Sequence, residues 1–91
     1  MGKYGYKFER ALVAEIVFLY EEKGVSHTSF AKLLYGDTST APSKWWKIRE
    51  CSPTGKPQSF PVTEAVEASE VLGIDVASLF FRVQEKIKSK S

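Results

Sequence analysis

Apolar residues recur every three or four positions along most of the chain, the spacing of one face of an α-helix. The first such stretch runs from about Lys7 to Lys23. Its apolar stripe consists of Phe8, Leu12, Ile16 and Leu19, widened by Ala11, Val13, Val17 and Tyr20. Gly24 follows directly, and glycine takes the left-handed conformation that ends helices at little cost. The pattern predicts a first helix that is central to the core.

Two shorter helices are predicted next. Thr28 or Ser29 can cap the second, which has an apolar side and ends at Gly36 and Asp37. Its inward residues are expected to be Phe30, Ala31, Leu33 and Leu34. The third has cap candidates in residues 38–40, Pro42 in its first turn, and continues to Glu50. Trp45 is expected to face the core, on the same side as Ile48 or Arg49.

Residues 51–58 contain Pro53, Gly55 and Pro57 and are expected to form a loop. A fourth helix should begin near Pro61 or Thr63 and end at Gly73, and Asp75 can cap a fifth. The expected inward positions of these two helices are Val62, Ala65, Val66, Ser69 and Leu72, and then Val76, Leu79, Phe80, Val83 and Ile87. No repeat and no long alternating run is present, so the sequence predicts an all-α, compact five-helix bundle.

The chain has 91 residues, 43% of them hydrophobic, which suits one domain with one core. We expect a flexible N-terminal arm at 1–7, the folded domain at 8–85 and a flexible tail at 86–91. The longest strongly apolar stretch, 11–20, is about half the length of a membrane span. Without a signal-peptide pattern, and with the single Cys51, a cytoplasmic protein that does not bind membranes is expected.

Charge is distributed unevenly although the net charge is only +2. Residues 38–58 carry Lys44, Lys47, Arg49 and Lys56 against Glu50. Residues 59–80 carry Glu64, Glu67, Glu70 and Asp75 and no cation. The first segment is suited to phosphate, whereas the second would be repelled by it.

Phe30 and Ala31 begin the second helix, and residues 71–80 read Val-Leu-Gly-Ile-Asp-Val-Ala-Ser-Leu-Phe. With the five-helix order, these features resemble the lambda-repressor and Cro-like family, also called Xre-like, over roughly residues 8–81. The resemblance implies a helix-turn-helix centred on residues 28–50. Two features depart from the family pattern. Tyr35 stands where the family usually has glycine, and Gly36 comes one residue later. The segment from Tyr35 to Ser43 is longer than the family's usual turn by about four residues, if Trp45 and Ile48 are the inward pair of the third helix.

A reading helix needs short or flexible polar groups on its outer face, because hydroxyls and lysines can bond to phosphates and base edges. The expected DNA-binding residues are Thr28, Ser29, Thr38, Ser39, Thr40, Ser43, Lys44, Trp46, Lys47, Thr54 and Lys56. The alternative for most of them is a solvated helix face or loop. Adjacent residues point about 100° apart on a helix, so we assign Trp45 to the core and Trp46 to the DNA backbone or a thymine methyl, with core packing of both as the alternative. For Lys3, Tyr4, Tyr6 and Lys7 the alternatives are an arm along the groove or a disordered tail.

Enzymatic sites are not indicated. His27 has no partner at metal-ligand spacing and is expected at the surface, and no recognisable base stands beside Cys51. Neither a phosphate loop nor a nucleophile elbow is visible. We therefore expect no enzyme activity, cofactor, metal or small-molecule substrate.

The sequence predicts a DNA-binding transcriptional regulator, repressor-like, that binds double-stranded DNA as a homodimer. One helix reads only a few base pairs, so a second copy adds contacts. Phe80 and Phe81, with Val83 and Ile87, are the candidate interface, and closure of the core is the alternative role. The alternative function is a helical protein-interaction module or an antitoxin that binds a partner protein.

Overall fold

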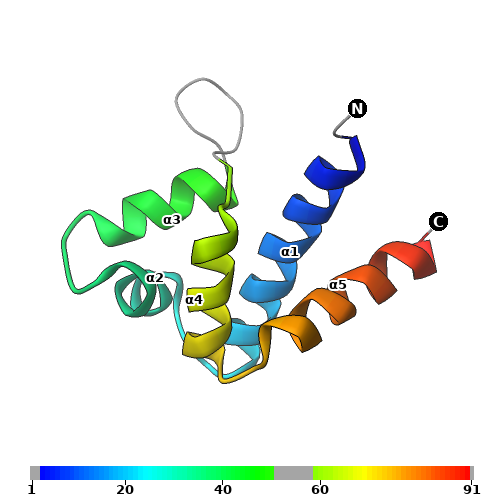
Figure 1. Ribbon diagram of the computed structural model, residues 1–91. Helices are drawn as coiled ribbons and strands as arrows, with labels where there is room; N and C mark the ends of the chain where they lie inside the picture. Colours follow the sequence, from blue (N-terminus) through cyan, green and yellow to red (C-terminus); the bar gives the residue numbers. More distant parts are fainter. Residues whose placement is uncertain (1–2, 51–58, 91) are drawn as a thin grey trace.

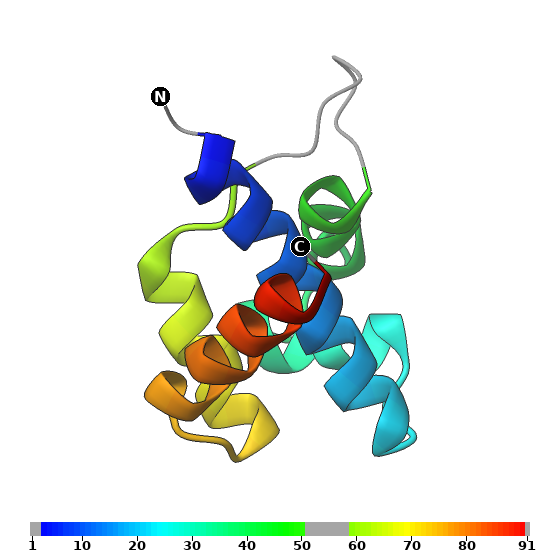
Figure 2. The same ribbon diagram turned by 90° about the vertical axis from the view of Figure 1, so that its right-hand side faces the viewer.

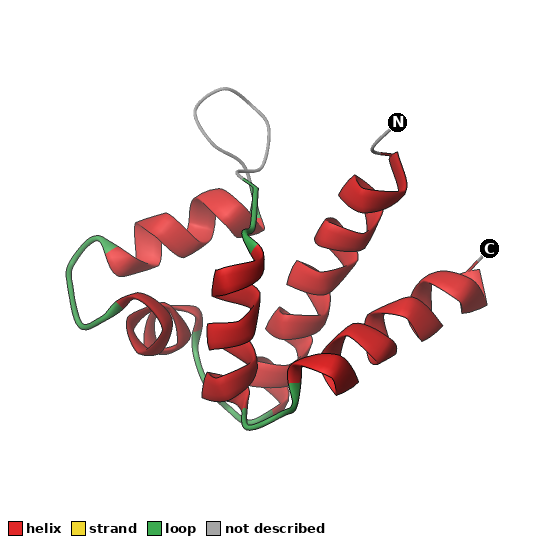
Figure 3. Ribbon diagram, viewed as in Figure 1, coloured by secondary structure: helices red, strands yellow, loops and turns green. Residues whose placement is uncertain are grey.

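Five α-helices and no strand are present in residues 3–50 and 59–90, which the computed structural model describes (Figures 1 and 3). The helices are α1 (Lys3–Glu22), α2 (His27–Tyr35), α3 (Ala41–Arg49), α4 (Val62–Leu72) and α5 (Val76–Lys90). The predicted all-α fold of five helices in one small globule is confirmed.

The centre of the core is aromatic. Tyr20 stacks on Phe30 with ring centroids 4.5 Å apart, and the ring of Trp45 lies 5.1 Å from Phe30 and 5.7 Å from Phe60. The indole Nε1 of Trp45 donates a hydrogen bond to the Tyr20 hydroxyl at 3.1 Å, so this buried polar group is paired. The cluster attaches the inner side of α3 to α1 and α2.

The helices pack so that α3 and α5 lie on opposite sides of the molecule, with α4 and α1 between them (Figure 1). Viewed from the side of α5, that helix crosses α1 (Figure 2). Glu15 of α1 is buried at this crossing. Its carboxylate accepts a hydrogen bond from Arg82 Nε at 2.9 Å and also pairs with Lys86. Burial raises the pKa of Glu15, but Lys86 and Arg82 together outweigh burial and hold that pKa below its ordinary value.

Both terminal helices are longer than predicted. α1 begins at Lys3 and not at Lys7, so most of the segment expected to be an arm is helical. Phe8 packs edge-on against Phe80 at 5.3 Å, which ties the start of α1 to α5. α5 continues to Lys90 through the segment expected to be a tail, and Lys86 and the partly buried Ile87 attach it to the bundle.

The N-cap of α2 was predicted two or three residues too late. Ser26 is the N-cap: its Oγ accepts a hydrogen bond from the backbone N–H of Ser29 at 3.1 Å, so Thr28 and Ser29 belong to the first turn. Tyr35 remains helical, and Gly36 follows with a φ of +100°, a value that favours glycine. Leu33, predicted to face inward, is 63% exposed, so that prediction was wrong; the buried residues of α2 are Phe30, Ala31 and Leu34.

The other helix ends agree with the prediction. Thr40 is the N-cap residue of α3, with Pro42 in the first turn, although its side chain makes no capping hydrogen bond. α4 ends at Gly73, which has a φ of +73°. Asp75 caps α5, because its Oδ2 accepts hydrogen bonds from the backbone N–H groups of Ala77 and Ser78.

Candidate nucleic-acid interface

α3 has two distinct sides. Its inward residues are Ala41, Trp45 and Ile48, all buried in the core. Its outward residues are Ser43, Lys44, Trp46 and Lys47, all exposed. Trp45 has no exposed surface and Trp46 is 50% exposed, so the predicted division between the two tryptophans is confirmed. A polar and cationic face of α3 therefore points away from the bundle.

Three contacts hold α3 in place. The side chain of Trp45, in the middle of α3, donates a hydrogen bond to Tyr20 in the centre of the core, as described above. Arg10 of α1 donates from Nη1 to the carbonyl of Ile48 at 2.7 Å, which satisfies a carbonyl in the last turn of α3. His27 of α2 makes the third contact. α3 is thus attached near its start, middle and end.

His27 is half-buried and bonded on both ring nitrogens, so its predicted surface position was wrong. Nε2 lies 3.0 Å from the carbonyl oxygen of Pro42, and Nδ1 lies 3.3 Å from Nη1 of Arg49. Because carbonyls only accept and guanidinium groups only donate, these contacts fit a neutral imidazole that carries its proton on Nε2. The edge of its ring also meets Trp46, with centroids 5.8 Å apart. His27 joins the start of α2 to α3.

The predicted interface residues fall into three groups. Thr28 and Ser29 are exposed in the first turn of α2, beside His27. Thr38, Ser39 and Thr40 are exposed in the connection that enters α3, where the Oγ1 atoms of Thr38 and Thr40 are 3.3 Å apart. The outward residues of α3 form the third group. Thr54 and Lys56 lie outside the described residues.

The two lysines of α3 differ in their surroundings. In the described part of the chain neither forms an ion pair. The Nζ of Lys44 lies 5.7 Å from the centre of the Tyr35 ring. Both lysines line a polar hollow of about 420 Å³ together with Tyr35, Ile48 and Glu64. The α4 side of the cationic face is therefore bordered by a carboxylate.

The carboxylate of Glu64 is itself engaged. The hydroxyl of Tyr35 on α2 donates a hydrogen bond to Oε1 of Glu64 on α4, at 2.7 Å. Burial raises the pKa of the Tyr35 phenol, and the hydrogen bond and charge of Glu64, together with the charge of Glu67, raise it further. Tyr35 thus keeps its proton and occupies one oxygen of the carboxylate nearest to the lysines.

The residues that position α3 or border its outer face were not identified from the sequence. His27, Arg10, Tyr35 and Glu64 make contacts across 15 to 38 positions of the chain. No local spacing could have indicated these partners, because each contact depends on how two helices cross.

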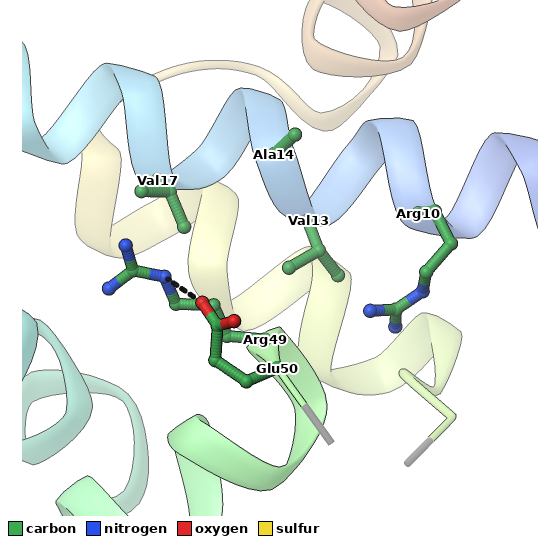
Figure 4. Close-up of a pocket in the computed structure, with 6 residues that line it drawn as sticks. All are labelled: Arg10, Val13, Ala14, Val17, Arg49 and Glu50. Carbon is green, nitrogen blue, oxygen red and sulfur yellow. Dashed lines mark ion pairs between the residues drawn. The ribbon is translucent and has the colours of Figure 1, made fainter. Parts of the chain in front are cut away.

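A second hollow, of about 300 Å³, lies between α1 and the end of α3 (Figure 4). It is lined by Arg10, Val13, Ala14, Val17, Arg49 and Glu50. Nε of Arg49 pairs with Glu50 at 3.3 Å, and Arg10 bonds to the Ile48 carbonyl. The cationic groups on its wall are therefore engaged within the protein.

An apolar surface covers parts of α4 and α5. Val62, Val66 and Phe81 are exposed, and Val62 also borders a small apolar hollow with Phe8, Leu12 and Phe80. Val83 has no exposed surface, so of the two roles predicted for it, closure of the core of its own chain is the one confirmed. Phe81, at 61% exposed, is the most accessible aromatic residue of the predicted set.

The described residues contain neither a cluster of metal ligands nor a membrane-spanning helix. No group of three or more histidine, cysteine and acidic side chains there is arranged to hold a metal ion. None of the helices there has the length and apolar character needed to cross a bilayer.

No protein-family model matches the chain, and no curated protein or solved structure matches it significantly. The likeness to the lambda-repressor and Cro-like family remains a prediction from sequence.

Proposed function

We propose that this protein is a sequence-specific, DNA-binding transcriptional regulator, repressor-like, in which α2 and α3 act as a helix-turn-helix. The observation that carries this proposal is the outward face of α3: Ser43, Lys44 and Lys47 are exposed beside Trp46, while the opposite side of the helix is fixed in the core. A helix with one anchored and one polar, cationic side suits the major groove.

The size and surroundings of α3 support this role. Nine residues of helix are about 13 Å long, enough to follow roughly four base pairs. The exposed Thr28 and Ser29, in the first turn of α2, lie near the same surface because His27 contacts both Pro42 and Trp46. Hydroxyls and free amides at a helix start bind phosphate well, so α2 would contact the backbone while α3 meets the bases.

The acidic residues support one orientation of the DNA. Glu64 and Glu67 lie on α4, on the Tyr35 side of the two lysines, and would repel phosphate. In the orientation that we propose, the duplex lies against the side of α3 that carries Trp46 and Ser43, and the two lysines lie at the edge nearest α4. The connection of five residues between α2 and α3, slightly longer than the usual turn of three or four, presents Thr38, Ser39 and Thr40 at the same end.

Replacing both Lys44 and Lys47 by alanine tests the proposal. If both neutralise phosphates, the slope of log affinity against log salt should become about two units less steep, because each released counterion contributes about 0.9. Fluorescence anisotropy with a labelled duplex measures the slope. Lys88→Ala on α5, the helix on the opposite side of the molecule from α3 (Figure 1), is the control and should leave it unchanged.

A slope that is equal in the double variant and the wild type would contradict phosphate contact by these lysines. The duplex itself comes from selection of bound sequences from a random pool, and enrichment of a palindrome would also support a homodimer. Circular dichroism confirms that the variants remain folded, as expected for exposed side chains.

The apolar surface of α4 and α5 favours a second candidate, a helical protein-interaction module or an antitoxin that binds a partner protein. Val62, Val66 and Phe81 are exposed apolar side chains, and Val62 borders an apolar hollow; exposed apolar residues of this kind suit a protein contact. Retention on heparin distinguishes the candidates. Strong retention that falls with salt supports DNA binding, and the absence of retention supports the interaction module.

A further inference from the structure

Trp46 is a large apolar side chain on a face that is otherwise polar. On α3 it follows Ser43 by three positions, so the two side chains are neighbours on the outer surface. Half of the residue is exposed to solvent, whereas the indole of the adjacent Trp45 is fully buried and fills the core. The exposed ring therefore serves no purpose in closing the core.

The indole ring of Trp46 also packs against a second ring of the protein. Its partner, the imidazole of His27, meets it edge-on at 5.8 Å. That imidazole is fixed by the Pro42 carbonyl on one nitrogen and by Arg49 on the other, and Arg49 in turn pairs with Glu50. An aromatic side chain that is already ordered loses little conformational entropy when it binds, so more of its contact energy remains available for recognition.

We propose that Trp46 is a specificity-determining residue that contacts the C5-methyl group of a pyrimidine in the major groove, with His27 as its positioning residue. This inference rests on the proposed DNA binding. The C5-methyl group of thymine is the apolar feature of the major-groove edge, and apolar side chains recognise it. An indole has a single N–H donor and no acceptor, so it cannot form the paired hydrogen bonds that identify guanine or adenine.

Two natural bases present this methyl group: thymine and 5-methylcytosine. Selection from two random pools distinguishes them, one with ordinary cytosine and one with 5-methylcytosine in its place. A thymine enriched in both pools at the contacted position identifies thymine as the source. Enrichment of 5-methylcytosine at that position in the second pool only identifies the methylated base. Either result supports the proposal when it is lost with Trp46→Ala.

Single-atom changes in the selected duplex give the direct test. Each methylated pyrimidine is replaced in turn by its counterpart without the methyl group, uracil for thymine or cytosine for 5-methylcytosine. We expect about fourfold weaker binding at one or two positions, since burial of one methyl group contributes about 0.8 kcal/mol. In Trp46→Ala the ratio of the two affinities should fall to about one at those positions.

Two variants serve as comparisons. Phe18→Ala removes a ring of similar exposure on α1, where Phe18 contacts Lys86 of α5, and should keep the methyl ratio of the wild type. His27→Ala should lower the ratio while the salt dependence of binding persists, because the lysines remain. A purely structural role of His27 would instead weaken binding equally for DNA with and without the methyl group.

The proposal would be overturned if the wild type bound every demethylated duplex as tightly as the parent duplex while its binding remained sensitive to salt. That result would leave the DNA-binding function standing. An absence of any salt-sensitive binding to duplex DNA would overturn both. A Trp46→Ala variant that still discriminates the methyl group would also reject the assignment to Trp46.

Discussion

Glu15 shows how a single buried residue joins two helices of this protein. Its carboxylate is 2% exposed, whereas its partners Arg82 and Lys86 of α5 are about half exposed. An isolated carboxylate at this depth would be costly, because it would lose its hydration without compensation. The two cations of α5 therefore make an ionised Glu15 compatible with the core.

This pairing predicts how stability depends on pH. The pKa of Glu15 is lowered on folding, so its contribution is present above the ordinary carboxyl pKa and is lost as the pH falls through the folded pKa. The wild type should lose stability in acid through this residue. Glu15→Gln should show a flatter decline below about pH 4 in urea unfolding.

Removing both cations should reverse the direction in which stability changes with pH through Glu15. In the double variant Arg82→Ala and Lys86→Ala, burial acts alone and raises the pKa of Glu15, so stability should fall as the pH rises above about 4. We expect a loss of about 3 kcal/mol at neutral pH. Adding Glu15→Gln to this variant should recover part of the loss. No recovery would contradict the view that an uncompensated charge causes it.

At the scale of the elements, the start of α2 fixes where the exposed hydroxyls lie. The cap at Ser26, and not at Thr28 or Ser29, leaves both of these residues in the first turn. Ser29 supplies the capping N–H, and its Oγ lies 3.1 Å from the Ser26 hydroxyl. The hydroxyl of Thr28 has no such structural role among the described contacts, so it remains available to a ligand.

Alanine substitutions at these positions should separate the two roles. Ser26→Ala should lower the free energy of unfolding by about 1 kcal/mol, because the N–H of Ser29 loses its acceptor. Thr28→Ala, the matched control, should change it by less than about 0.5 kcal/mol. Urea unfolding at neutral pH measures both. Equal effects would show that Ser26 is not the cap on which α2 depends.

At the scale of the whole molecule, the proposed DNA contact of one copy would be short. α3 has nine residues, and the molecule measures 38 × 32 × 21 Å along its principal axes. A second copy that places another α3 one helical turn away would double the number of base pairs read. We propose the exposed Phe81 of α5, which belongs to the interface that the sequence predicts, as part of the contact between the copies.

Phe81→Glu should weaken this association, because it places a charge in the centre of an apolar contact. In sedimentation velocity we expect the wild type as a dimer, free or on its DNA site, and the variant as a monomer with weaker DNA binding. Phe18→Glu is the control on a different exposed ring and should leave the mass unchanged. A wild type that sediments as a monomer both free and on DNA would contradict the dimer.

The apolar periodicity of the sequence and its helix-ending and helix-capping residues determined the number and order of the helices. Gly73 and Asp75 mark the boundary between α4 and α5 by their own backbone and side-chain preferences, and Pro42 marks the start of α3 in the same way. Helical geometry separates Trp45 and Trp46 by about 100°, so only one of them can face the centre of the core, and that one is Trp45. Such features depend on neighbours within about four residues, so the sequence by itself contains them.

Only the tertiary structure decided what surrounds the outer face of α3. The bonds of His27 to Pro42 and Arg49, the pairing of Tyr35 with Glu64, and the burial of Glu15 depend on how helices cross. The same holds for Val83, which the sequence could assign equally to the core or to an interface. The physical reason is that a periodic pattern gives the side of a helix on which a residue lies, whereas its partners are set by the packing of several helices at once.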